Sequence, residues 1–359
     1  LWIMKLFRQL VAIHNISIFS LNILSSIFLL IGIFCLYIIT GSFHYLEINH
    51  LLSEIADNST LKVCLAILTF GLLIKSNFIP IYSAISKNLK YTPISILSLS
   101  IITCSSMGLY ILYKWTHILF PSTLLVSPIL LFIASSLVLF SCVSSLCQET
   151  LQRSLSFLLL SYTGLILLSL NTNITGLPFL YLIHFMITFS SIFLLLGLLR
   201  RIWHYDFYKK SCYIWLKTPV IGALFFIQLL SIVGLPPLSG FWANFQLISS
   251  ILSLPYSFFY LFPFCFFYIV MLLFISKTWH RLSSKNKKIE PHMTDTKKTS
   301  LIASIFIAII FSNLLTIYPN TIIKLVQATS LPLESINHYK KSIYSMKKND
   351  NNTIEVNYK

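Results

Sequence analysis

The stretch Gly234-Leu235-Pro236-Pro237-Leu238-Ser239-Gly240-Phe241-Trp242-Ala243-Asn244 lies inside a long apolar run, Pro219 to Leu254. Such a run predicts a membrane helix, but two consecutive prolines remove two backbone donors and their rings clash with the preceding turn. Carbonyl groups freed in this way are tolerated within a membrane only where the backbone is buried in protein or lines a wet cavity. Gly234 and Gly240 allow the backbone to bend on either side. We therefore predict a broken helix, interrupted close to Leu235–Ser239.

A second break is predicted by Lys75 and Pro80, a charge and a proline inside the apolar run Leu61 to Tyr82. Two proline-interrupted segments in an otherwise apolar chain are the best pointer in a sequence to a transport path across the membrane. The rest of the chain is then the helical scaffold for these two places.

Composition fixes the fold class as an all-α, polytopic helical membrane protein. The 359 residues are 56 % hydrophobic and only 10 % charged, with a mean hydropathy of +0.82, and a soluble domain cannot hide so much apolar surface. The net charge of +16 falls in short loops and in the C-terminal tail, so we expect a lipid bilayer and no nucleic acid as partner. Apolar runs of about 20 residues predict about nine spans. They are Ser17–Thr40, Leu61–Tyr82, Thr92–Tyr113, Leu124–Cys147, Leu155–Leu170, Gly176–Leu199, Pro219–Leu254, Tyr256–Ser276 and Leu301–Tyr318.

Loop charge indicates that the run Pro219–Leu254 crosses only once. With one interrupted crossing the basic segments all fall on one side: the N-terminus and the loops with Lys87 and Lys90, with Arg153, at Arg200–Thr218 and at Lys277–Ser300. Two crossings would place the loop Lys277–Ser300 on the other side, against the positive-inside bias. The N-terminus is then cytoplasmic or on the matrix side, and the C-terminus is outside. The predicted organisation is an N-terminal segment at 1–16, a transmembrane domain at 17–318, an amphipathic interfacial segment at 319–337 with a helix near Ile322–Gln327, and a polar, disordered tail at 338–359.

Few titratable side chains lie within the predicted spans. All ten acidic residues fall outside them, so the carboxylate relay typical of pumps is missing. Lys75 needs a partner or a wet cavity at its depth and could cycle a proton; the alternative is that it snorkels from a span ending near Asn77. His184 can donate and accept at once, although a lone membrane histidine is commonly a helix contact. Asn244, just after the break, is expected to face inward, where its amide can order water but carries no charge.

The seven cysteines form no C-x-x-C pair and have no histidine at ligand spacing. We interpret them as small buried apolar residues, and we expect no metal, haem or other cofactor in this chain. Any enzymatic role is therefore expected to be that of a membrane subunit without a redox site.

At these residues the chain resembles the proton-conducting membrane transporter family. That family contains the antiporter-like subunits of respiratory NADH:quinone oxidoreductase and the large subunits of multi-subunit Na+/H+ antiporters. The similar segments are Gly234 to Phe241, Lys75 with Pro80 and Thr92-Pro93-Ile94-Ser95, Gln148-Glu149 with Arg153 to Phe157, Ser161 to Gly164, and His184 with Phe193-Leu194 and Gly197. The resemblance implies that Lys75 and His184 are proton-relay residues and that Pro80, Gly234, Pro236, Pro237, Gly240 and Asn244 shape the broken helices.

The chain also departs from the family pattern. The resemblance implies that the chain corresponds to the family from about the sixth span onward, and we expect the glutamate that pairs with the Lys75-type lysine to belong to the preceding spans of the family. The position of Asn244 is a lysine or glutamate in the family, the span Thr92–Tyr113 lacks the expected basic residue or histidine, and a lysine near Phe189 is absent.

The resemblance implies an antiporter-like membrane subunit that contributes to proton translocation coupled to NADH:quinone oxidoreduction, in a bacterial or mitochondrial inner membrane, with other membrane subunits as partners. One alternative is a subunit of a multi-subunit monovalent cation/H+ antiporter, which would also move Na+. The other is a degenerate structural subunit that fills a membrane arm without conducting.

Overall fold

The computed structural model describes residues 22–41, 48, 59–76, 94–119, 126–172, 174, 176–203 and 219–283. Within these ranges all regular structure is α-helical, and five helices are long and apolar enough to cross a membrane. The predicted all-α, polytopic membrane fold is therefore confirmed. The helices are Asn22–Thr40, α3 Ser59–Lys75, α5 Ile94–Leu119, α6 Val126–Cys147, α7 Leu151–Leu170, α8 Leu177–Trp203, α10 Pro219–Val233, α11 Gly240–Leu252 and α12 Ser257–Ser283.

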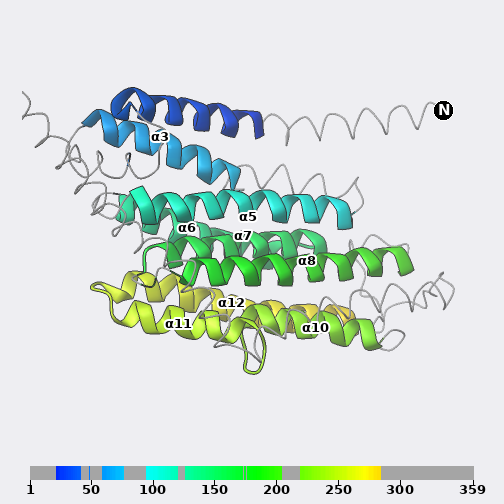
Figure 1. Cartoon of the computed structure of the whole chain (residues 1–359). Helices are drawn as coiled ribbons and strands as arrows, with labels where there is room; N and C mark the ends of the chain where they lie inside the picture. The colour runs from blue at the N-terminus through cyan, green and yellow to red at the C-terminus, as the bar shows by residue number, and fades with distance from the viewer. Residues whose placement is uncertain are drawn as a thin grey trace, which may run out of the picture.

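Short connections fold the helices back and forth into a bundle. The turns at 148–150 and 253–256 are too short to carry the chain across a bilayer, so the helices that they join are antiparallel. Figure 1 shows the helices side by side, with α5 between α3 and α8 and with α10 and α11 end to end along one edge. Together α10 and α11 reach as far as a single neighbouring helix. The broken run therefore makes one interrupted crossing, as the loop charges predict.

The core of the bundle is built around α7. Of its apolar window 89 % is buried, compared with 17 % for the helix Asn22–Thr40, so α7 is central and the first helix is peripheral. Gly164 lets α7 approach α6 closely, because a Cβ at that position would lie 2.7 Å from Cγ2 of Val138. The hydroxyls of Ser161 and Thr163 donate to carbonyls of their own helix, so these polar groups are satisfied inside the apolar core.

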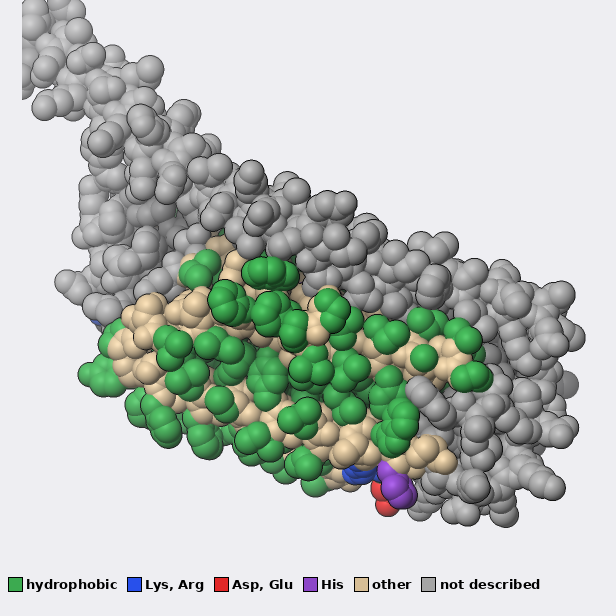
Figure 2. Space-filling model, turned by 90° about the horizontal axis from the view of Figure 1, so that it is seen from below, with side chains coloured by type: hydrophobic (Ala, Val, Ile, Leu, Met, Phe, Trp, Pro, Cys, Tyr) green, Lys and Arg blue, Asp and Glu red, His purple; other side chains and the backbone are tan. Residues whose placement is uncertain are grey.

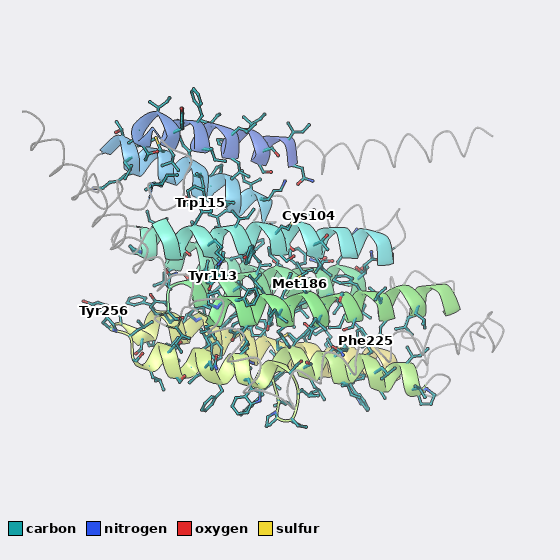
Figure 3. The ribbon with its side chains drawn as sticks, in the orientation of Figure 1. Cys104, Tyr113, Trp115, Met186, Phe225 and Tyr256 are labelled. Atoms are coloured by element: carbon teal, nitrogen blue, oxygen red, sulfur yellow. The ribbon has the colours of Figure 1, made fainter. Side chains whose placement is uncertain are left out.

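The outer face of the bundle is suited to lipid. Figure 2 shows one such face covered largely with hydrophobic side chains, with its few charged groups at the margins. At the turn between α11 and α12, Tyr256 is 79 % exposed, and Phe258 and Phe259 follow it on the surface. Figure 3 places Tyr256 at the extreme end of the bundle. Exposed aromatic residues in that position are typical of the boundary between membrane and water.

Several helices extend further than hydropathy predicts, among them α5 to Leu119 and α8 to Trp203. Charged residues at the ends of α7 and α12 show two causes. Arg153 was expected in a loop, but α7 begins at Leu151, and the Thr150 side chain accepts a hydrogen bond from the Arg153 backbone N–H at 3.3 Å as an N-cap. Lys277 was also expected in a loop and lies inside α12. Its Nζ donates to the Leu146 carbonyl at the end of α6, a group that has no partner within its own helix. A local cap thus extends α7, and a tertiary contact of a charged side chain extends α12.

The prediction that the cysteines are buried is wrong for most of those described. Cys142 is buried, Cys35 and Cys64 are half-buried, and Cys104, Cys147 and Cys265 are exposed. A thiol is apolar enough to face lipid, so hydrophobicity does not decide its side of a membrane helix. Pro80, the predicted span Leu301–Tyr318, the predicted interfacial helix Ile322–Gln327 and the terminal segments lie outside the described residues.

Candidate functional site

The break in the membrane helix is closed by a turn at Gly234. Helix α10 ends at Val233, and the Gly234 N–H donates to the carbonyls of Leu230 (3.0 Å) and Ser231 (3.1 Å). Gly234 has φ +74°, a left-handed conformation that favours glycine and commonly ends a helix. This turn satisfies the carbonyls of Leu230 and Ser231. The Val233 carbonyl accepts instead from the Asn244 side chain, described below.

The prolines themselves form the outer part of the interruption. Pro236 and Pro237 are exposed, and Leu235 is 42 % exposed. The chain passes around them and re-enters the bundle at Ser239, whose hydroxyl lies 2.6 Å from that of Ser231. Helix α11 then begins at Gly240. A Cβ there would lie 2.3 Å from the Ser231 carbonyl oxygen, so glycine is needed for the two half-helices to meet.

Asn244 joins three helices at the inner side of the break. Its Nδ2 donates to the Val233 carbonyl at 3.0 Å, and its Oδ1 accepts from the Tyr181 hydroxyl of α8 at 2.7 Å. The side chain is 7 % exposed, so it faces inward as the sequence predicts. The amide satisfies the orphan carbonyl at the end of α10 and holds α11 against α8. In this role it is a structural latch that does not titrate.

His184 lies in the middle of α8 and is 2 % exposed. Its Nδ1 is 2.5 Å from the hydroxyl of Tyr162 on α7. Because the tyrosine hydroxyl needs an acceptor for its proton, we assign Nδ1 as the acceptor, which places the proton of the neutral imidazole on Nε2. Nε2 makes no hydrogen bond of ordinary distance and angle among the described residues, although the Ser231 backbone lies near the ring. The free position of the imidazole thus faces the end of α10 where the membrane helix is interrupted.

An aromatic cage surrounds Tyr162, the hydrogen-bond partner of this imidazole. The Tyr162 ring lies 5.5 Å from His184, 5.7 Å from Tyr181, 5.5 Å from Phe189 and 6.4 Å from Phe267, measured between ring centroids. Most groups in the cage are aromatic rings, so the few polar groups there are the candidates for function. The two tyrosines connect His184 on one side to Asn244 on the other through contacting rings and hydroxyls.

Lys75 occupies a different part of the bundle. It is the last residue of α3 and is half-buried, and the backbone at 75–76 is so close to Gly108 of α5 that a Cβ there would lie 2.8 Å from the Ser76 nitrogen. Figure 1 shows α5 between α3 and α8. In Figure 3, Tyr113 lies on α5 towards α8, and its ring is next to Tyr110, which contacts Phe179 of α8. The structure therefore brings His184, Asn244 and the two glycines together, and places Lys75 beyond α5.

Sequence reasoning missed Tyr162, Tyr181, Ser231 and Ser239. One signal was available, because Tyr181 and His184 are three residues apart and so share a face of α8. Tyr162 lies inside the segment Ser161 to Gly164 that carries part of the family resemblance. Its pairing with His184 of the next helix depends on tertiary packing, which the sequence does not show.

Replacing Asn244 by leucine should lower the free energy of unfolding by about 2–3 kcal/mol, because it leaves the Val233 carbonyl and the Tyr181 hydroxyl unpaired in the core. Tyr181→Phe should cost about 1 kcal/mol, and the double variant should cost less than the two single changes added together. Denaturant unfolding of the purified chain in detergent measures all three. Strict additivity would contradict the hydrogen bond between these side chains.

The model of the NADH:quinone oxidoreductase/Mrp antiporter transmembrane family matches residues 12–271, which include the break, His184 and Lys75. The chain belongs to this family. It is 28 % identical over 233 residues to a D-type subunit of a Na(+)/H(+) antiporter from Bacillus subtilis, covering 63 % of this chain and 47 % of the relative. It is 25 % identical over 229 residues to an N-type subunit of NADH-quinone oxidoreductase from Desulforudis audaxviator, covering 62 % and 45 %. The chain thus spans about half the length of the curated relatives it matches.

Solved structures of family assemblies share the fold. A chain of the Mrp complex from a Dietzia species has a TM-score of 0.72 at 19 % identity, with 88 % of this chain and 67 % of that chain covered. A chain of respiratory complex I from Thermus thermophilus has a TM-score of 0.76 at 14 % identity, with 90 % and 69 % covered. At these identities the likeness concerns the fold alone.

Proposed function

We propose that this chain is an antiporter-like membrane subunit of an energy-converting complex, and that it contributes to proton translocation coupled to NADH:quinone oxidoreduction. The observation that carries the proposal is His184, a buried imidazole whose Nε2 has no described partner and faces the broken helix. Among side chains, imidazole is suited to this task because it has two nitrogens that can hold the proton in turn.

The scarcity of other titratable groups gives this imidazole its importance. No aspartate or glutamate lies within the described helices. A proton that crosses this part of the bundle would therefore use His184 and water at the break, and Lys75 would serve the neighbouring segment behind α5. We assign no cofactor to the chain, since protons alone are moved along this path.

The break also suggests membrane partners. Leu235, Pro236 and Pro237 form irregular backbone halfway along the crossing, and they are exposed on this chain. Irregular backbone at membrane depth is tolerated only against protein or water. We propose that another membrane subunit covers this loop, in the inner membrane of a bacterium or a mitochondrion.

Two alternatives rest on specific observations. Similarity to the antiporter protein of Bacillus subtilis favours a subunit of a cation/H+ antiporter, in which Na+ would be the exchanged ion. Asn244 favours a structural subunit, because both ends of its amide are already engaged at the position where the family resemblance implies a titratable group.

Lys75→Met is expected to reduce proton uptake several-fold in vesicles that contain the assembled complex, because it removes an ammonium group from the proposed proton path. Lys62→Met is the matched control, since Lys62 lies on the same helix and is also half-buried. NADH-driven uptake, measured with a pH-sensitive dye, separates the two. Equal uptake by the two variants would remove Lys75 from the path.

A further inference from the structure

The first two described helices pack against each other more closely than helices with side chains at the contact could. A Cβ at Gly32 would lie 2.8 Å from Cβ of Leu68 on α3, and a Cβ at Gly71 would lie 3.1 Å from the Leu29 nitrogen. Figure 1 shows the helix Asn22–Thr40 beside α3. As the residue number rises on one helix it falls on the other, so the two helices are antiparallel and in a defined register.

That register places Cys35 opposite Cys64. The contact between Gly32 and Leu68, continued by one turn along each helix, brings these two residues to the same level. The thiols of Cys35 and Cys64 are near enough to interact electrostatically. Both are free and half-buried, so small reagents can reach them from one side. The glycine contacts hold the two backbones at the short separation that a disulfide requires.

The position of the pair along the helices suits oxidation. Cys35 precedes the end of its helix at Thr40 by five residues, and Cys64 follows the start of α3 at Ser59 by five, so each lies about 8 Å from that end of the bundle. The connecting sequence 41–58 contains three acidic residues and no lysine or arginine. This end is therefore the outer side by the positive-inside bias, and the outer side of an inner membrane is where disulfides persist.

We propose that Cys35 and Cys64 form a dithiol site that hydrogen peroxide oxidises to a disulfide, cross-linking the first helix to α3. One thiolate attacks a peroxide oxygen, the O–O bond breaks, and a sulfenic acid and water are produced. The second thiol attacks that sulfur and releases a second water, so two thiols and one peroxide give one disulfide and two waters. Hydrogen peroxide fits the site because it is small and uncharged and can enter the apolar layer. The cross-link fixes the outer half of α3, the helix that ends at Lys75.

The test counts protected thiols in membranes that contain the full chain in its complex. Membranes are treated with hydrogen peroxide and dissolved in SDS with N-ethylmaleimide, then reduced and labelled with a polyethylene glycol maleimide that retards the chain on a gel. The wild type should gain two labels, Cys35→Ser and Cys64→Ser should each gain none, and Cys265→Ser on α12 should still gain two. Two labels in either of the first two variants would overturn the proposal, as would none in the wild type.

A second measurement needs no variant. Protease digestion of the oxidised wild-type chain without reductant should release a linked peptide that contains Cys35 and Cys64, two hydrogen masses lighter than the sum of its parts and lost on reduction. Linked peptides that join other cysteines in place of this pair would contradict the assignment.

Discussion

Replacing Gly234 by alanine is expected to destabilise the chain by about 3–5 kcal/mol, enough to prevent its accumulation in the membrane. Two effects act together at this position. The backbone has φ +74°, which costs a residue with a Cβ about 1–2 kcal/mol. The new Cβ would also lie 2.0 Å from Nδ2 of Asn244 and would displace the amide from the Val233 carbonyl and from Tyr181.

Gly41→Ala is the matched control for this prediction. Gly41 also has a positive φ, +68°, but a Cβ there would have nothing within 4 Å. The control should therefore show only the backbone cost of about 1–2 kcal/mol. Thermal unfolding of the two purified variants in detergent compares them directly. An equal loss at both positions would mean that the contact between Gly234 and Asn244 does not hold the break together.

His184→Phe is expected to lower proton translocation by about 100-fold, because phenylalanine keeps an aromatic ring at this position but cannot hold a proton. That ring can lie against the Tyr162 ring as the imidazole does, so the chain should still assemble. In this variant the Tyr162 hydroxyl loses its acceptor, and this loss should lower the free energy of unfolding by only about 1–3 kcal/mol. Assembly is checked by native gel, and translocation by dye quenching in vesicles.

Tyr268→Phe provides the control within the same region. Tyr268 on α12 contacts Phe267 of the cage, and its hydroxyl has no hydrogen-bond partner among the described residues. Removing that hydroxyl should leave translocation within about twofold of the wild type, because the change leaves the pairing of His184 with Tyr162 intact. A loss as large as that of His184→Phe would show that any polar change near the cage stops transport.

The break could be predicted from the sequence because its causes are local. Two prolines and two flanking glycines fix where α10 ends and α11 begins, whatever surrounds them. The spans were predictable for a related reason, since their length and apolarity are set by the bilayer. Every predicted span before Leu301 corresponds to at least part of a described helix.

The contacts that make a site of the break could not be predicted in the same way. Hydropathy assigned Arg153 and Lys277 to loops, whereas a cap and a carbonyl of another helix draw them into helices. Asn244 was expected to face inward. Its hydrogen bond to the Val233 carbonyl, however, depends on how α11 packs against the end of α10. The partner of His184 likewise depends on the packing of α7 against α8.

The number of protons translocated per NADH oxidised tests the central claim most directly. It is measured in vesicles of the assembled complex, with wild-type chain and with His184→Phe in parallel, recording dye quenching and NADH absorbance in the same sample. The proposed relay predicts that the variant oxidises NADH with fewer protons moved per molecule than the wild type. An unchanged ratio, in a variant shown to be assembled, would contradict the relay and leave the chain as a structural subunit.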